Sequence, residues 1–515
     1  MFNKLLKILC NNREWGSRLC TDWQILDGKI KPDIWSPAGS VWISLLNAQW
    51  SAQHNGANLI GTGAHDVPSL VNSPVVIAMW RPLAEALGWP GKAIGWSDIA
   101  KLSTDPHGWS AYGHPELDSQ FGSFKFGHTH PGYSNSGLDS VIAMNYAAVN
   151  KRSGLTSADV KSAMAKQFVN NVESSVIHYG DSTGFFAEKM FGKGPAFLSA
   201  CVMYESLVVE ANNGKKYPHL PYPVVAIYPK EGTFFSDHPF AVLQADWVTP
   251  AKKAAAQVLR QFLLAPAQQK KALQYGFRPS DPRMQLTAPL DKAHGVDPAQ
   301  PQSVLPIPNA GVVSDIGNIW QEQRRKVDVM LVLDRSGSMN DSIGDKKKID
   351  DAKEGLQQFV SLMSDNDQLG LTVFSTGSDV ISPLSPLGPK RQEVKNSINA
   401  LYAEGWTYLY DTVGAQHDPL QAFPSRDIKA LVVLSDGQDT SSTKYNLNSL
   451  IEKVKAKGRN AGESIKIFTI AYGNDADVNV LKQIAEATGG QEYAGTPQDI
   501  QEIYFDISEF LAGRF

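Results

Sequence analysis

Two patterns of hydrophobic and polar positions divide the chain. From Val327 onward, short continuous apolar runs alternate with stretches in which apolar residues recur every three or four positions. Continuous runs are typical of strands buried on both faces, and the longer recurrence is typical of amphipathic helices. This alternation predicts an α/β domain over residues 327–515, a doubly wound parallel sheet with helices on both faces.

The apolar runs indicate where the strands of this sheet lie. VDVMLVLD (327–334) and IKALVVLSD (428–436) each end at a carboxylate, and QLGLTVFST (368–376) is a third strand. Residues 348–363 place their apolar side chains on one helical face, as a helix that covers a sheet should. Such sheets bind ligands at the carboxyl ends of their strands, so the polar residues there are the candidates for function.

The first half of the chain has a less regular pattern. PDIW predicts a short strand before a turn and a helix, and SPVVIAMW (73–80) predicts another strand. The segment 124–149 predicts a strand, a polar loop and a helix, and residues 245–281 predict two helices. We therefore expect a separate α/β module over residues 1–283. Residues 284–326 are rich in Pro, Gln and Gly, a composition that favours an extended linker between the modules.

Composition and charge narrow the classes of function. Of the 515 residues, 42% are hydrophobic and 19% are charged, which is typical of globular and not of disordered chains. The 48 Lys and Arg against 52 Asp and Glu give a net charge of −4, which removes the electrostatic reason to expect nucleic-acid binding. The 3 cysteines are too few for a disulfide framework. No apolar run is long enough for a transmembrane helix, and the opening MFNKLLKILCNNREW is a poor signal peptide.

Oxygen-bearing side chains follow the predicted strands of the second module. Asp334, Ser336 and Ser338 occupy alternate positions on a tight turn after the first strand, Thr407 lies in a later loop, and Asp436 ends another strand. Hydroxyl and carboxylate oxygens are the donors that hard cations prefer. Two formal negative charges leave a bound cation electron-poor, so a carboxylate from another molecule is a natural further ligand. The set predicts a divalent metal site that takes Mg²⁺, or else Mn²⁺ or Ca²⁺.

These residues closely resemble the metal-ion-dependent adhesion site of von Willebrand factor type A domains. The family pattern is D-x-S-x-S after the first strand, a Thr in a later loop, and an Asp that ends the fourth strand. The resemblance covers residues 326–513 and implies that this domain binds a protein through an Asp or Glu carboxylate on the metal. Many relatives have Gly-Gly-Thr in the middle loop, whereas this chain has Gly405-Trp406-Thr407.

The same motif has a structural alternative, because Ser clusters and Asp residues are also common as helix caps and in turns. A hydrolase is not indicated. Ser336 has no neighbouring His that could act as a base, and the only His of the domain, His417, lies inside a predicted helix. We therefore expect a protein that is not an enzyme.

The first module resembles a two-lobed extracytoplasmic solute-binding protein, of the class that includes molybdate binders. The segments that carry the resemblance are PDIWSPAGS, FKFGHTHPGYSNSG, MYES and LQYGFRP. It implies lobe one at 1–117 and 223–283 and lobe two at 118–222. It also implies a ligand cleft with Ser36, Ser134, Ser136 and Tyr204 as candidates, although a core aromatic and plain helix caps are the structural alternatives.

This first module departs from the family pattern at its beginning. Only about 30 residues precede PDIW, and they do not show the strand, loop and helix that the family has there. We therefore expect either that the true start of the chain lies further upstream or that the first lobe lacks its first strand.

Two hypotheses follow from the sequence. The first is an envelope-associated, extracytoplasmic binding protein that combines a solute-binding-like module, for a small solute or a transporter component, with metal-dependent protein binding. The alternative is a cytoplasmic assembly factor that works with a ring ATPase, a role in which type A domains also serve; the absence of a clear signal peptide favours it.

Overall fold

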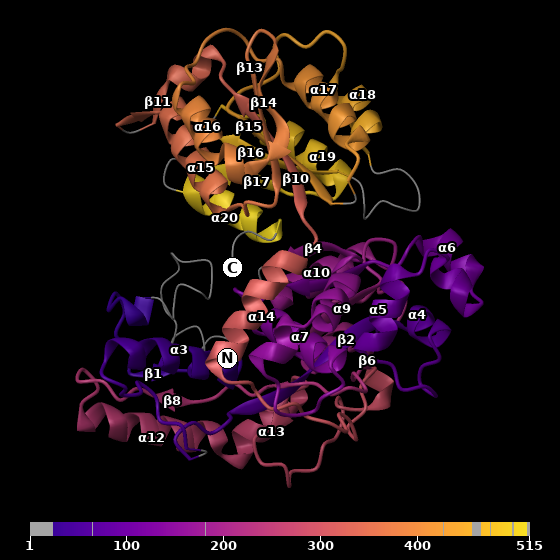
Figure 1. The fold of residues 1–515 in the computed structure, drawn as a ribbon, viewed down its shortest axis with the longest axis vertical. Coiled ribbons are helices and arrows are strands. Elements are labelled where there is room, and N and C mark those ends of the chain that lie inside the picture. The colour runs from indigo at the N-terminus through magenta and orange to yellow at the C-terminus, as the bar shows by residue number, and fades with distance from the viewer. Residues whose placement is uncertain are drawn as a thin grey trace.

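Two sheets organise the chain, one in each predicted module. The computed structural model describes residues 24–511, apart from 64, 181, 344, 426, 456–464, 474 and 497–498. In Figure 1 the C-terminal module forms the upper body and the rest of the chain forms the lower one. The mixed α/β class predicted for both is confirmed.

The strands of the lower body are β1 (Ile34–Trp35), β2 (Val71–Trp80), β3 (Phe126–Thr129), β4 (Val176–Gly180), β5 (Ala200–Tyr204), β6 (Val224–Ile227), β7 (Phe235–Ser236), β8 (Ala241–Val242) and β9 (Arg278–Pro279). Its helices are α3 (Ser40–Gln53), α4 (Arg81–Ala86), α5 (Trp96–Thr104), α6 (Pro115–Phe121), α7 (Asn135–Ala148), α8 (Ser157–Lys161), α9 (Ala163–Glu173), α10 (Thr183–Lys193), α11 (Glu205–Asn212), α12 (Pro250–Leu264), α13 (Pro266–Gln274) and α14 (Ala310–Gln323).

The large sheet of the lower body has the order β4-β3-β5-β2-β6, with β7 and β9 pairing to β2. Strand β2 is antiparallel to both β5 and β6, and almost all of its residues are buried. Its continuous apolar run is therefore explained by a central position in the sheet.

This topology corrects the predicted division into lobes. Residues 71–80 and 224–227 were assigned to lobe one, but they pair within the same sheet as the strands of lobe two. The lobe that holds this sheet therefore begins at β2 and extends through β6.

The other lobe is the smaller of the two. It contains α3, α12 and a two-stranded sheet in which Ile34 pairs with Val242. The predicted absence of a first strand concerns the segment ahead of residue 24, which lies outside the described residues.

The predicted extended linker over 284–326 is also wrong, because most of this segment packs. Leu290, Val296 and Leu305 are buried, and helix α14 presents Val312, Ile316 and Trp320 to α7, α8 and α9. The Pro-rich flanks obscured a helix whose apolar residues recur at helical spacing. Figure 1 shows α14 lying on the lower body and leading directly into the upper one.

The strands of the upper body are β10 (Val327–Asp334), β11 (Ser342–Ile343), β12 (Lys346–Lys347), β13 (Gln368–Phe374), β14 (Ser378–Pro386), β15 (Ile428–Ser435), β16 (Lys466–Tyr472) and β17 (Glu492–Gly495). Its helices are α15 (Lys348–Leu362), α16 (Leu387–Asn399), α17 (Leu409–Ala422), α18 (Leu447–Val454), α19 (Val478–Thr488) and α20 (Ile500–Phe510).

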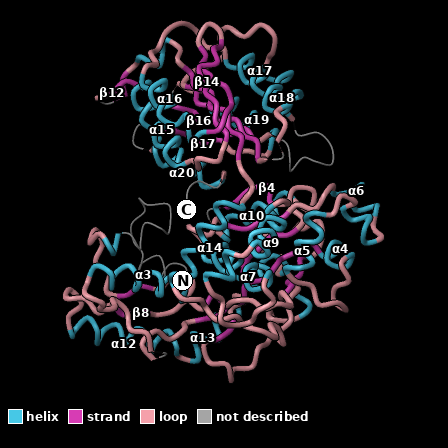
Figure 2. The backbone as a smooth tube through the Cα atoms, viewed as in Figure 1, coloured by secondary structure: helices cyan, strands magenta, loops and turns pink. Residues whose placement is uncertain are grey.

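The sheet of the upper body has the order β14-β13-β10-β15-β16-β17 and is parallel except for the edge strand β14. Figure 2 shows these strands at the centre of the body with helices on both sides. Alternate residues of β10 enter two cores: Leu331 lies in the core of α15 and α20, and Val332 in the core of α17 to α19. The predicted doubly wound sheet is therefore confirmed.

The junction of α14 and β10 contains a buried ion pair. Arg324, just after α14, donates to both carboxylate oxygens of Asp367 at 3.0 and 2.9 Å, and both side chains are fully buried. Asp367 also accepts from the backbone N–H of Val327 and of Ser364. One carboxylate thus fixes the start of β10, the start of β13 and the end of α14.

We predict that Arg324→Ala destabilises the protein by about 3 kcal/mol or more, because it leaves the carboxylate of Asp367 buried and unpaired. Denaturant unfolding monitored by tryptophan fluorescence measures this change. The matched control is Arg283→Ala, which removes an exposed ion pair with Asp281 and should have a much smaller effect because water screens that pair. Equal effects of the two substitutions would contradict this interpretation.

Candidate functional site

The five predicted metal ligands lie at one edge of the upper sheet. Strands β10 and β15 are neighbours and run parallel, so Asp334 at the end of one and Asp436 after the other reach the same edge. Asp334, Ser336, Thr407 and Asp436 are buried. The fold therefore brings these side chains to the same edge of the sheet, as the sequence predicted.

Short hydrogen bonds connect most of this set. The Ser336 hydroxyl lies 3.0 Å from that of Ser338, which donates to Asp436 at 2.8 Å. Asp334 accepts from the Ser336 backbone N–H at 2.8 Å and from the Ser435 hydroxyl at 2.6 Å. The hydroxyls of Ser336 and Ser338 and the carboxylate of Asp436 are therefore linked directly, whereas Asp334 bonds within its own turn and to Ser435.

Thr407 joins the set through its loop. Gly405 has a φ of +79°, and its carbonyl accepts from the N–H of Gly337 in the D-x-S-x-S turn. A Cβ at Gly437 would lie 3.6 Å from the Thr407 hydroxyl and 3.9 Å from that of Ser338, so both hydroxyls border this glycine. Trp406 points outward with 66% of its surface exposed, and the bulky residue leaves Thr407 in place.

A buried lysine adds positive charge to the site. The Lys348 ammonium at the start of α15 lies 2.8 Å from Asp436 and 3.3 Å from Asp475. Burial raises the pKa of Asp334 to about 6, and the charge of Asp436 acts in the same direction. Lys348 thus compensates one carboxylate, whereas Asp334 has only neutral donors among its hydrogen-bond partners.

The donor set fits a divalent cation with oxygen ligands. Its two carboxylates and three hydroxyls match the preference of Mg²⁺, and they leave room in the coordination shell for an external ligand. Among the described residues no group of three or more His, Cys, Asp or Glu could hold a metal ion, so the hydroxyls are essential to this interpretation. The role of the five residues as metal ligands stays a prediction.

The predicted cleft serines form a second cluster. Ser134 stands at the N-cap position of α7, where its side chain makes no capping hydrogen bond. The Ser136 hydroxyl lies 2.7 Å from that of Thr183 and 2.9 Å from that of Thr129. The Ser134 hydroxyl lies 3.2 Å from the same Thr183. All four side chains are buried. The structure therefore brings Ser134 and Ser136 together at the start of α10.

Ser36 approaches this cluster from the other lobe. Its loop continues to Gly39, where a Cβ would lie only 2.3 Å from the amide oxygen of Asn135 in α7. The buried hydroxyl of Ser36 has no hydrogen-bond partner among the described residues. Tyr204, which ends β5, is buried in the large core. The lobes are thus in contact at the predicted cleft.

Two carboxylates that the sequence pattern did not indicate lie beside this contact. Asp139 accepts from the Asn135 amide at 2.7 Å, and Asp237 accepts from the backbone N–H of Ser40 at 2.8 Å. Burial raises the pKa of both, and the charge of Asp237 adds to the effect on Asp139. Asp139 could have been found from its position one turn into the predicted helix, whereas no local signal marks Asp237.

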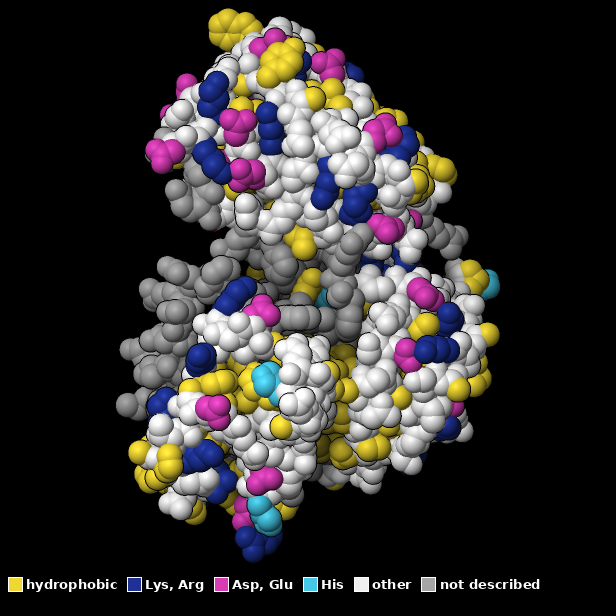
Figure 3. Space-filling view, turned by 60° about the vertical axis from the view of Figure 1, so that its left-hand side comes forward, with side chains coloured by type: hydrophobic (Ala, Val, Ile, Leu, Met, Phe, Trp, Pro, Cys, Tyr) yellow, Lys and Arg dark blue, Asp and Glu magenta, His cyan; other side chains and the backbone are white. Residues whose placement is uncertain are grey.

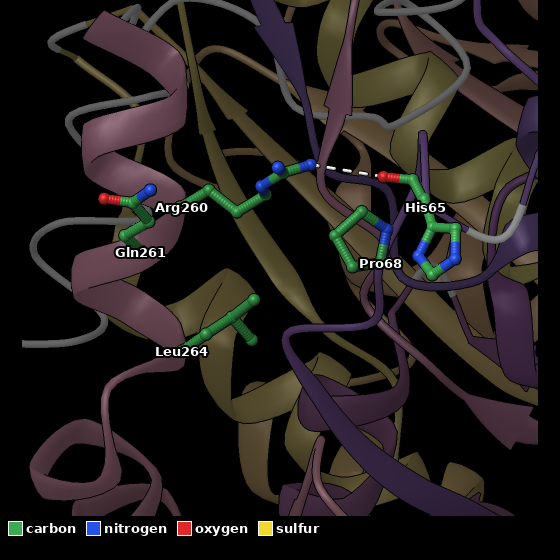
Figure 4. A pocket seen from close by; sticks show the side chains of 5 residues that line it. All are labelled: His65, Pro68, Arg260, Gln261 and Leu264. Atoms are coloured by element: carbon green, nitrogen blue, oxygen red, sulfur yellow. Dashed lines mark hydrogen bonds between the residues drawn. The ribbon is translucent and has the colours of Figure 1, made fainter.

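A shallow surface pocket of about 460 Å³ lies elsewhere in the lower body. Figure 4 shows Arg260 and Leu264 of α12 facing His65 and Pro68, with Arg260 donating to the His65 carbonyl at 3.2 Å. None of the predicted cleft residues lines it, so it is not the expected solute site.

Together, the fold and the site define a binding protein built from two modules. The chain belongs to the family described as bacterial extracellular solute-binding protein, whose pattern it matches over residues 16–278. Its residues 328–508 match the von Willebrand factor type A domain. Both predicted resemblances are confirmed.

Among curated proteins, the chain is 26% identical over 184 residues to the uncharacterized protein YwmD of Bacillus subtilis, which covers 33% of this chain and 80% of that protein. It is 25% identical over 198 residues to human inter-alpha-trypsin inhibitor heavy chain H4, covering 36% of this chain and 20% of that protein.

Solved structures resemble each module separately. A von Willebrand factor type A protein from Catenulispora acidiphila is 22% identical, with a TM-score of 0.32, over 36% of this chain and 42% of that one. A periplasmic thiamin binding protein is 15% identical, with a TM-score of 0.41, over 60% of this chain and 84% of that one. Within the described residues, no helix has the length and apolar character needed to cross a membrane.

We predict that Gly39→Ala lowers the thermal midpoint by several degrees, because the new methyl group would overlap the amide of Asn135, which Asp139 holds in place. Differential scanning calorimetry measures the shift. Gly184→Ala is the matched control, since a Cβ there meets nothing within 4 Å. The double variant Gly39→Ala/Asn135→Ala lacks the amide that the methyl group would overlap, so its thermal midpoint should recover in part. An unchanged thermal midpoint in Gly39→Ala would contradict the close contact.

Proposed function

We propose that the chain is a non-enzymatic binding protein of the cell envelope. Its type A domain binds a protein through a divalent metal, and its solute-binding module takes a small solute or contacts a transporter component. The observation that carries the proposal is the set of Asp334, Ser336, Ser338, Thr407 and Asp436 at one edge of the sheet. Membership in an extracellular solute-binding family favours this location over a cytoplasmic assembly factor.

The chemistry of the site supports docking and not catalysis. A bound divalent metal supplies an electrophilic position for an Asp or Glu carboxylate of the partner protein. The protein oxygens would orient that metal, and the Ser336 hydroxyl lies 3.0 Å from Ser338 with no His beside it in the described structure. His417, as predicted, lies inside helix α17. A nucleophile without a base is poorly suited to hydrolysis.

The surface around the site also suits a protein partner. Exposed Trp406 and Tyr402 lie in the loop that carries Thr407, and the guanidinium of Arg335 stacks over the Tyr402 ring at 5.5 Å. Tyr, Trp and Arg are the residues most often responsible for binding energy in protein interfaces. Figure 3 shows basic and acidic side chains intermixed over this body, without a patch of a single sign on that face.

Isothermal calorimetry of the full chain with Mg²⁺ and Mn²⁺ tests the metal site. We expect one binding event, which Asp334→Ala/Asp436→Ala abolishes because the two carboxylates supply the negative charge of the site. Asp350→Ala, which changes an exposed residue in the first turn of α15, is the control and should bind as the unmodified protein does. Equal metal binding by the double variant would refute the assignment.

We predict further that Lys348→Gln strengthens Mg²⁺ binding by roughly tenfold, because it removes a buried positive charge that contacts Asp436 and repels the cation. The same titration measures the change. Lys353→Gln, which changes a lysine of the same helix that pairs with Asp350, is the matched control. A weaker or unchanged affinity in Lys348→Gln would show that the ammonium does not compete with the metal.

A further inference from the structure

Helix α12 presents apolar side chains to two sides. Its inward side contributes Ala256 and Leu263 to a small hydrophobic core. Another side exposes an apolar row at helical spacing, formed by Ala251, Ala255, Val258 and Phe262. Val258 and Phe262 have 68% and 50% of their surfaces exposed. An apolar row that the protein itself leaves uncovered indicates a binding surface.

Helix α13 continues this surface. Only Ala265 separates the two helices, and Figure 1 shows them one after the other along the lower edge of the lower body. Tyr275, just after α13, has 69% of its surface exposed, and Lys271 one helical turn before it is also exposed. Figure 3 shows hydrophobic side chains next to basic ones at the lower left of this body.

Basic side chains accompany the apolar ones along these helices. Residues 247–280 contain six Lys and Arg and no Asp or Glu, although the whole chain has a net charge of −4. Two of the six are paired, Lys252 with Asp33 and Arg278 with Glu205. Within the described part of the chain, the other four form no ion pair: Lys253, Arg260, Lys270 and Lys271.

The carboxylates that border these helices do not cancel this charge. Asp246 is exposed ahead of α12, and exposed Asp66 lies in the segment that contacts Arg260. Asp281 pairs with Arg283. A fifth basic side chain offsets part of the negative charge, because the ammonium of exposed Lys31 lies 5.8 Å from an indole ring just ahead of α12. The surface therefore combines exposed apolar side chains with a positive net charge.

An anionic lipid surface fits both properties. Lysine side chains reach lipid phosphates while their methylene stems lie along apolar surface, and Phe and Val side chains enter the boundary of the acyl chains. Anionic lipids attract several nearby Lys and Arg together. A protein partner is usually anchored by side chains in well-packed pockets, whereas the pocket beside Arg260 is shallow. A lipid surface needs no such pocket.

We propose that the outer face of α12 and α13 binds an anionic membrane surface. Lys253, Lys270 and Lys271 contact lipid phosphates, and Val258 and Phe262 enter the interface between headgroups and acyl chains. The contact is peripheral and reversible, and it does not involve the metal site. Because the upper body lies at the opposite end of the molecule, the type A domain would face away from the membrane, toward a partner protein (Figure 1).

Co-sedimentation of the full chain with vesicles tests the proposal, in EDTA so that metal-mediated contacts do not contribute. Vesicles of phosphatidylglycerol and phosphatidylcholine in equal parts are compared with vesicles of phosphatidylcholine alone. We expect binding to the anionic vesicles to be at least tenfold tighter. Two sets of substitutions should each weaken that binding at least tenfold: Lys253→Gln/Lys270→Gln/Lys271→Gln and Val258→Ser/Phe262→Ser.

Each set of substitutions has a matched control. Lys92→Gln/Lys101→Gln/Lys215→Gln removes the same charge from exposed lysines of the lobe that holds the large sheet. Tyr402→Ser/Trp406→Ser removes two exposed aromatic side chains from the type A domain. Both controls should bind the anionic vesicles as the unmodified chain does. Circular dichroism establishes that every variant is folded.

Three results would overturn the proposal. The first is the absence of binding to anionic vesicles at roughly millimolar lipid, and the second is binding that neither set of substitutions in α12 and α13 weakens. The third comes from sedimentation velocity without lipid. A dimer that Val258→Ser/Phe262→Ser dissociates would show that a second copy of the chain, and not a membrane, covers this face.

Discussion

The parallel pairing of β10 with β15 is the constraint on which the candidate metal site depends. Val327 pairs with Ile428 and Leu333 with Leu434, so the carboxylates that follow the two strands must emerge at the same edge of the sheet. A shift of one residue in this register would turn every side chain of β10 to the opposite face and exchange the two cores. The register of the two central strands thus determines where the carboxylates of the site lie.

Helix α14 and the residue Arg324 after it connect this sheet to the other module. Trp320 is fully buried against the solute-binding module, where its indole N–H donates to Glu173, and four residues later Arg324 holds Asp367 in the type A domain. Residues on both sides of this helix belong to one continuous hydrophobic core. The two modules therefore form one packed unit and not two domains joined by a flexible linker.

The sequence was most informative where local pattern and function coincide. Strand β10 and the turn after it could be predicted because a continuous apolar run, a carboxylate and alternating serines are adjacent in the chain. The burial of Lys348 could not be predicted, because Lys348 is the last of three consecutive lysines. Only the packing of α15 determines which of the three points inward. The lobe boundary was wrong because the pattern of β2 indicates burial on both faces without indicating which strands flank it. Helix α14 was missed because prolines around it outweighed its own helical spacing.

A crystal structure of the full chain grown with Mn²⁺ tests the central claim most directly. The account predicts an anomalous difference peak bordered by Asp334, Ser336, Ser338, Thr407 and Asp436, with the Lys348 ammonium moved away from Asp436. A site without such a peak at saturating Mn²⁺, with the contact between Lys348 and Asp436 intact, would contradict it.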